Sequence, residues 1–183
     1  LTFPFAIRNQ LTTTLSTLKG ASSVKNELLS YMNDFYVNNF NESAKSKHKG
    51  IGFGNNQDKT SSYELAKILR AHKIDVLETN GEKFKYYVPI KQKKSKLIKA
   101  MFDTQTKFED SLFYDVSAWT FPLAFNLNYD FLKESLEGNK MFEKPEGKVS
   151  GFSNYGYLIK PHDYNIPAFI NYLQEKEIRL KSS

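Results

Sequence analysis

Two polar side chains and one aromatic side chain within a single apolar stretch are the first candidates for chemistry. Asp115 and Ser117 stand two residues apart, and Trp119, the only tryptophan, follows at the same spacing. Residues of equal parity on a strand point to the same side of a sheet. At the end of a parallel strand they would face the crevice in which open α/β sheets bind ligands. The sequence places no histidine beside them, so a Ser-His-Asp triad is unsupported. We favour the alternative in which Asp115 and Ser117 satisfy amides of a helix end or loop.

The histidines and glycines indicate neither a metal site nor a phosphate loop. The run from His72 to Asp75 superficially resembles a two-ligand metal motif, but it crosses from a helix into a strand, so its side chains need not share a face. Interaction with the helix dipole is enough to explain His72. The glycines of Gly50–Gly54 (GIGFG) fit neither the dinucleotide fingerprint nor the P-loop. We interpret this segment as a buried strand with close backbone packing.

The strongest charge cluster is a run of lysines without an acid among them. Its members are Lys83, Lys85, Lys91, Lys93, Lys94, Lys96 and Lys99, interleaved with Tyr86 and Tyr87. Such a cluster could bind phosphate backbones. Arginine is scarce, however, and the cluster spans a strand, a turn and a helix. We therefore favour a solvated face that keeps the domain soluble.

Composition limits the classes of protein that the chain can belong to. A length of 183 residues fits one domain, or one domain with part of another. Hydrophobic residues make up 40% and aromatic residues 15%, which is enough for a packed core. The chain has no cysteine, so disulfides, thiolate metal sites and cysteine nucleophiles are excluded. The net charge is +6, and no signal-peptide pattern follows Leu1, so we expect the natural chain to begin further upstream.

The N-terminal part is predicted to belong to another domain. Leu1–Ile7 reads as a short strand, with Pro4 at its edge or start, and a helix is predicted from about Ser23 to Asn38. Apolar residues nearly vanish between Asn38 and Gly50. We therefore predict that residues 1–40 are the tail of an upstream domain, 41–49 a linker, and 50–183 an α/β domain truncated at its end.

The segments after residue 50 alternate between strand and helix patterns. Helices are predicted from Ser61, as N-cap of a capping box with Glu64, to His72, and over Ser95–Phe102. Strands are predicted at 50–54, 74–77, 84–90 and 112–116, with a short helix over 119–125 whose first turn holds Pro122 and a mobile connection over 133–154. This alternation predicts a mostly parallel sheet with helices on both faces.

The tail shows a weak internal repeat. Residues 51–79 align without a gap on 155–183, with Asn165 and Pro167 at the start of the second helix. Because any two strand–loop–helix–strand units would share much of this pattern, we favour coincidence over duplication. A chain that stops at Ser183, within or just after a strand, leads us to expect a natural continuation.

Several segments resemble large bacterial zinc carboxypeptidase-like proteins. The most specific is Asp110–Phe125 (DSLFYDVSAWTFPLAF). Phe84–Gln92 (FKYYVPIKQ) and the passage from Phe102 are similar to the same proteins, and Leu1–Gly20 resembles the tail of their peptidase domain. The resemblance implies a flavodoxin-like domain similar to class I glutamine amidotransferases after the peptidase domain. It also implies a secreted or periplasmic location.

The chemistry of that family does not carry over to these residues. It requires a His-x-x-Glu pair and a distant histidine on zinc, an arginine for the substrate carboxylate and a glutamate base. No His-x-x-Glu occurs here, and the amidotransferase nucleophile is missing because there is no cysteine. The resemblance therefore implies that zinc and the peptide substrate belong to the upstream domain, and we assign no catalytic, cofactor or metal residue.

Two functions of different classes follow. The first is a non-catalytic accessory domain that packs on the peptidase domain of the same chain. The second is a standalone module that binds an anionic ligand or nucleic acid through the Lys83–Lys99 face. We favour the first and expect no nucleic-acid or membrane partner. An independent hydrolase is disfavoured by the missing nucleophile and metal ligands.

Overall fold

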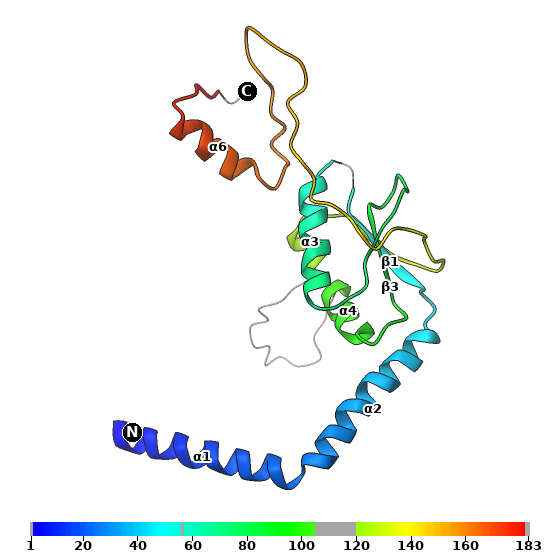
Figure 1. The fold of residues 1–183 in the computed structure, drawn as a ribbon, viewed down its shortest axis with the longest axis vertical. Helices are drawn as coiled ribbons and strands as arrows, with labels where there is room; N and C mark the ends of the chain where they lie inside the picture. Colours follow the sequence, from blue (N-terminus) through cyan, green and yellow to red (C-terminus); the bar gives the residue numbers. More distant parts are fainter. Residues whose placement is uncertain (1, 56, 105–119, 182–183) are drawn as a thin grey trace.

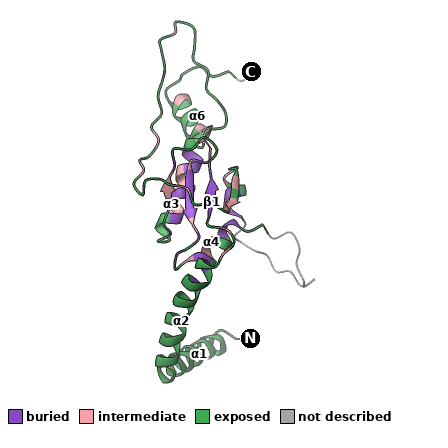
Figure 2. Cartoon of the chain, turned by 90° about the vertical axis from the view of Figure 1, so that its right-hand side faces the viewer, coloured by how far each residue is buried: buried purple, intermediate pink, exposed green. Residues whose placement is uncertain are grey.

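The chain folds into a small α/β domain that stands between a helical arm and an extended C-terminal segment (Figure 1). The computed structural model describes residues 2–55, 57–104 and 120–181. Within the described residues, buried side chains are concentrated in the central domain, whereas the first helices and the last helix are mostly exposed (Figure 2). The domain is therefore the only part with a core of its own among these residues.

The helical arm consists of α1 (Phe3–Ser23) and α2 (Lys25–Ala44), which meet at a bend at Val24. The predicted strand over Leu1–Ile7 is wrong, because Thr2 is the N-cap of α1 and Phe3–Ile7 lies in the helix. Pro4 lies in the first turn, where its missing N–H would be unpaired in any case. The helix predicted from about Ser23 to Asn38 is confirmed as α2, although it continues six residues beyond Asn38 to Ala44.

The sheet contains four strands in the order β2-β3-β1-β4, and every neighbouring pair is antiparallel. The strands are β1 (Gly50–Phe53), β2 (Leu77–Glu78), β3 (Tyr86–Pro89) and β4 (Tyr129–Leu132). The prediction of a mostly parallel, flavodoxin-like sheet of the glutamine amidotransferase type is therefore wrong.

The connections explain why the alternating sequence pattern was misleading. Helix α3 (Lys59–Ala71) leads from β1 to β2, and these two strands run in the same direction. They are not neighbours, because β3 lies between them. In the same way, β3 and β4 run parallel with β1 between them, and α4 (Ser95–Phe102) and α5 (Phe121–Ala124) lie in that connection. This is the split β-α-β connectivity of ferredoxin-like domains, which yields an antiparallel sheet from crossover units.

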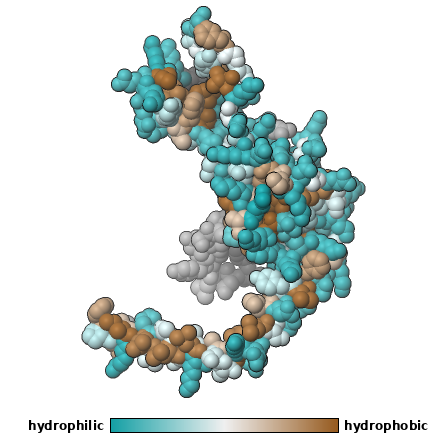
Figure 3. Space-filling view, viewed as in Figure 1, coloured by the Kyte–Doolittle hydropathy of each residue, from teal (hydrophilic) through white to brown (hydrophobic). Residues whose placement is uncertain are grey.

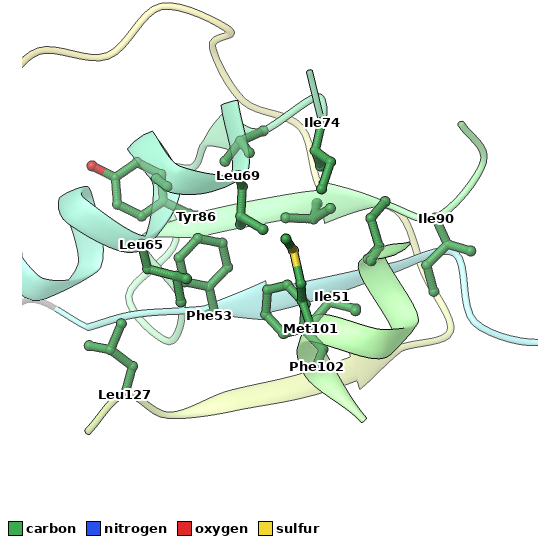
Figure 4. Close-up of a cluster of buried hydrophobic side chains, with 14 residues drawn as sticks. Ile51, Phe53, Leu65, Leu69, Ile74, Tyr86, Ile90, Met101, Phe102 and Leu127 are labelled. Carbon is green, nitrogen blue, oxygen red and sulfur yellow. The ribbon is translucent and has the colours of Figure 1, made fainter. Parts of the chain in front are cut away.

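The core lies on one face of the sheet, under α3 and α4 (Figure 4). Ile51 and Phe53 of β1 share this face, as residues two apart on a strand must. The predicted arrangement with helices on both faces is wrong, because both helices contribute to this single cluster. Its buried members are Ile51, Phe53, Leu65, Ala66, Leu69, Ile74, Val76, Tyr86, Val88, Ile90, Ile98, Met101, Phe102 and Leu127.

The opposite face is covered by aromatic rings that lie on glycines. A Cβ atom at Gly50 would overlap the ring of Tyr87, and one at Gly52 would overlap the ring of Phe84. Both rings are buried, and a side chain on either glycine would displace them. The interpretation of this glycine-rich segment as a buried strand with close backbone packing is confirmed.

Helix α3 begins differently from the prediction. Its N-cap is Asp58, whose carboxylate accepts hydrogen bonds from the amide (2.8 Å) and the hydroxyl (2.6 Å) of Ser61. The predicted capping box with Ser61 as N-cap is wrong by one turn. The N-cap is three residues earlier, and Asp58 accepts from the Ser61 amide that Glu64 was expected to bind. The prediction for Ser95–Phe102 is confirmed to the residue, and Pro122 does lie in the first turn of α5.

The C-terminal segment does not repeat the first α/β unit. Helix α6 (Ile166–Glu175) is present, but it buries none of its residues, and no strand precedes or follows it among residues 141–181. The helix of the proposed second unit is thus confirmed, and its strands are not found. Strand β4, which no prediction covered, completes the sheet instead.

Candidate functional site

Asp115, Ser117 and Trp119, the crevice predicted from the sequence, lie in residues 105–119, outside the described part of the chain. The strand predicted over 112–116 falls there too.

The lysine cluster does not form one face. Lys83 and Lys85 precede β3, whereas the other five follow it, so a four-residue strand of about 13 Å separates the two groups. Lys85 forms an ion pair with Glu78 (2.6 Å), and Lys83 forms one with Asp130 (3.4 Å). At the other end, Lys96 lies 3.9 Å from Glu42. Carboxylates therefore neutralise part of the charge that the sequence shows as an unbroken run.

The histidines are placed apart. His48 packs against the ring of Phe131, with centroids 5.5 Å apart, and His72 is the C-cap residue of α3. Among the described residues, no group of three or more histidine, aspartate or glutamate side chains is arranged to hold a metal ion.

Tyr86 is the one core residue whose ionisation is strongly changed. Burial raises the pKa of its hydroxyl well above the usual value, and the nearby Glu78 and Tyr63 raise it further. Tyr86 therefore stays neutral in the folded protein at pH values at which a free tyrosine ionises.

Asn39 anchors the arm to the domain. Its side chain is 1% exposed, donates a hydrogen bond to the carbonyl of Lys93 (2.7 Å) and accepts one from the hydroxyl of Ser95. Both partners lie at the start of α4. An amide side chain can donate and accept at once, so this single residue fixes the last turns of α2 against α4.

Two lysine–aromatic contacts surround this anchor. The ammonium of Lys96 lies 4.9 Å from the ring centroid of Phe35, and that of Lys91 lies 5.8 Å from the ring centroid of Phe40. Both distances are within the range of a cation–π attraction. The joint between arm and domain is therefore defined by specific polar and aromatic contacts, and the arm projects from it (Figure 1).

The rest of the arm carries an uncovered apolar surface, which we call the arm stripe. In α1 it consists of Phe3, Ile7, Leu11, Leu15 and Leu18, at helical spacings of four, four, four and three. It continues with Val24 at the bend and with Leu28, Met32 and Phe35 in α2. All are exposed, Leu18 to 63%. Figure 3 shows apolar residues gathered along α1 and α2. Neither arm helix, nor any other helix in the described ranges, is both long and apolar enough to cross a membrane.

A pocket of about 310 Å³ lies beside the arm joint, at the edge of the glycine-bearing face of the sheet. We call it the Tyr87 pocket. It is partly open to solvent and is lined by residues from α2, the following linker, β2, β3 and the segment after β4, namely Ser43, Ala44, His48, Lys49, Leu77, Tyr87, Pro89, Lys91, Ser135 and Leu136. No acidic side chain belongs to this lining.

The hydroxyl of Tyr87 is buried without a hydrogen-bond partner. Tyr87 is 2% exposed, and its hydroxyl end lies over Gly50. Buried polar atoms are nearly always paired, so an orphan of this kind needs an explanation. Sequence reasoning missed this pocket, although Tyr87 was noted as an aromatic residue within the lysine cluster.

Comparisons with protein-family models, with curated proteins and with solved structures give no match for this chain.

Proposed function

We propose that this chain is a non-catalytic accessory part of a zinc carboxypeptidase-like protein, and that its helical arm packs against the upstream peptidase domain of the same chain. The observation that carries the proposal is the arm stripe, which the central domain leaves uncovered. Helices gain most of their stability in proteins by packing an amphipathic face against other elements. The stripe of α1 has no such surface within the described residues, so it requires one elsewhere.

The position of the stripe supports this assignment. Residues 1–20 resemble the tail of a peptidase domain, and residues 3–20 of this segment lie in α1. The anchor at Asn39 joins α2 firmly to α4, so a surface that held α1 would also orient the small domain. In this proposal the domain stabilises or orients the peptidase, while zinc and the peptide substrate are bound upstream.

The alternative function, binding of nucleic acid through the lysine cluster, has weaker support. The cluster is divided by β3, and Lys83, Lys85 and Lys96 lie near carboxylates. Binding to a polyanion is strongest where several unpaired cations follow one surface. The observed distribution does not favour that arrangement.

The test compares this chain with a longer one that includes the upstream region. The proposal predicts that only the longer protein holds zinc and releases C-terminal residues from peptides. Stoichiometric zinc and peptidase activity in the 183-residue chain would contradict it. So would a longer protein with neither property.

A substitution in the stripe locates the contact. Leu15→Gln removes an apolar side chain from the stripe, whereas Thr13→Gln changes the opposite side of α1. In the longer protein Leu15→Gln is expected to lower the free energy of unfolding by about 2 kcal/mol, the value of a buried leucine. Thr13→Gln is expected to have little effect. Equal effects of the two substitutions in the longer protein would argue against a docked stripe.

A further inference from the structure

We propose that residues 155–181 are an incomplete α/β unit of the same kind as residues 51–77, and that their apolar face receives a β-strand supplied from beyond Ser183. We call these segments the tail unit and the first unit. The tail unit lies at the opposite end of the chain from the arm stripe, so this inference is independent of the function proposed above.

The helices of the two units end in the same way. When the units are aligned, α3 and α6 end at the same position, and Lys73 and Glu177 follow at the same distance. Their φ angles are 60° and 55°. Positive φ angles are uncommon for residues other than glycine, and Asn126 is the only other case in the described ranges. The next amide donates to the carbonyl five residues earlier, at 3.1 Å in the first unit and 3.0 Å in the tail unit. The two helix ends are therefore alike in backbone geometry as well as in sequence.

The tail unit also repeats the apolar positions by which the first unit covers the sheet. The aligned pairs are Leu65 with Phe169, Ala66 with Ile170, Leu69 with Leu173, Ile74 with Ile178 and Val76 with Leu180. Each first-unit member is at most 3% exposed, whereas no tail-unit member is buried. The tail unit therefore carries a face suited to covering a sheet, and this face is uncovered in the structure.

The first unit shows what the tail unit lacks. Strands β1 and β2 do not pair with each other, and each pairs with β3, which lies between them and follows them in sequence. A split unit of this kind forms a sheet only when the middle strand joins it. At the same offset the counterpart of β3 falls beyond Ser183. The absence of the middle strand explains why α6 is formed while no strand flanks it among residues 141–181.

Gly156 indicates what the middle strand brings. It aligns with Gly52 of β1, where a Cβ atom would overlap the ring of Phe84. Phe84 lies two residues before β3, so this ring arrives with the middle strand. A Cβ atom at Gly156 would meet no atom within 4 Å. We therefore expect an apolar strand that places an aromatic ring over Gly156.

The described residues offer no other cover for the tail unit. Its loop is tied to the central domain, because Asp163 accepts a hydrogen bond from the hydroxyl of Thr60 (3.3 Å) and the ring of Tyr164 stacks on Phe125, with centroids 6.3 Å apart. Helix α6 itself stands away from the sheet (Figure 1). A second copy of the chain has no free middle strand to give, since its β3 is held between β1 and β2. The added strand would therefore complete a second sheet beside the first.

The experiment compares the 183-residue chain with one that continues past the counterpart of β3, using NMR and hydrogen exchange. In the longer chain, exchange of the amides of residues 155–157 and 178–180 should slow about a hundred-fold. Both segments should show cross-strand contacts to one added strand and none to each other. Gly156→Ala should speed this exchange at least about ten-fold, because its methyl group would displace the ring. Gly147→Ala, which also meets no atom in this structure, is the matched control. In the 183-residue chain neither substitution should alter exchange.

Several results would overturn the proposal. Fast exchange of the tail unit in the longer chain would show that no strand is added. Direct contacts between residues 155–157 and 178–180 would show neighbouring strands rather than a split unit. Equal effects of Gly156→Ala and Gly147→Ala would exclude a ring over Gly156. Protection in the 183-residue chain that increases with protein concentration would assign the apolar face to a second copy instead.

Discussion

Replacing Asn39 with alanine should detach the arm from the domain without unfolding the domain. The substitution removes the donor to the Lys93 carbonyl and the acceptor for the Ser95 hydroxyl. The hydroxyl keeps a weaker acceptor, the main-chain carbonyl of residue 39 at 3.3 Å, so the main loss is one hydrogen bond and part of a second. Buried bonds of this kind contribute about 1 kcal/mol each, and an orphaned group adds a penalty. We therefore expect the docked joint to lose about 2 kcal/mol.

Trypsin provides the assay, because Lys45, Lys47 and Lys49 follow α2 directly. When cleavage requires local opening and reclosing is fast, its rate follows the free energy of opening. A loss of about 2 kcal/mol should raise the cleavage rate in this segment about thirty-fold. Asn38→Ala is the matched control, since Asn38 is the neighbouring asparagine and is exposed. Its cleavage rate should equal that of the unaltered chain.

A double-mutant cycle tests the reason for this effect. If Asn39 acts through Ser95, adding Ser95→Ala to Asn39→Ala should cost less than the two single losses together. Equal cleavage of Asn39→Ala and Asn38→Ala, or full additivity in the cycle, would show that Asn39 does not hold α2 against α4 through Ser95.

The remaining predictions concern the stability of the central domain. Gly52→Ala should lower the free energy of unfolding by about 1–3 kcal/mol in urea denaturation, because its methyl group would overlap the ring of Phe84. Gly147→Ala, which meets no neighbouring atom, should not lower it. Asp58→Ala should cost about 1 kcal/mol as a lost N-cap. Glu64→Ala should cost less, because Glu64 pairs only with the exposed Lys67 in this structure. A larger loss for Glu64→Ala than for Asp58→Ala would support the capping box. Because the pKa of Tyr86 is raised in the folded state, the unfolded state releases this proton first, so stability should fall above about pH 10 by up to about 1.4 kcal/mol per pH unit. Tyr86→Phe should reduce this slope.

Local sequence patterns predicted the secondary structure of the domain better than its topology. Apolar spacing located α4 (Ser95–Phe102) to the residue, and it located the buried strand β1 (Gly50–Phe53). The same patterns could not show that β3 lies between β1 and β2, because a crossover unit looks alike whether its strands are neighbours or next-nearest neighbours. The parallel sheet was therefore a reasonable but wrong inference.

The start of the chain shows a second limit of prediction from local sequence patterns. A run such as Leu1–Ile7 fits either an edge strand or a first helical turn with proline, and only the continuation of the stripe through Leu11 and Leu15 decides for a helix. The Tyr87 pocket could not have been predicted, because its lining comes from four segments that are separated in sequence. The glycines of β1 did signal that something packs closely there, without indicating which rings.

Hydrogen exchange along α1 tests the docking of the arm most directly. It should be measured in the 183-residue chain and in a longer chain that includes the upstream region. We expect fast exchange of the amides from Ile7 to Leu18 in the short chain, because α1 buries no residue there, and strong protection of the same amides in the longer protein. Fast exchange in both proteins would contradict the claim that the arm stripe docks on the peptidase domain.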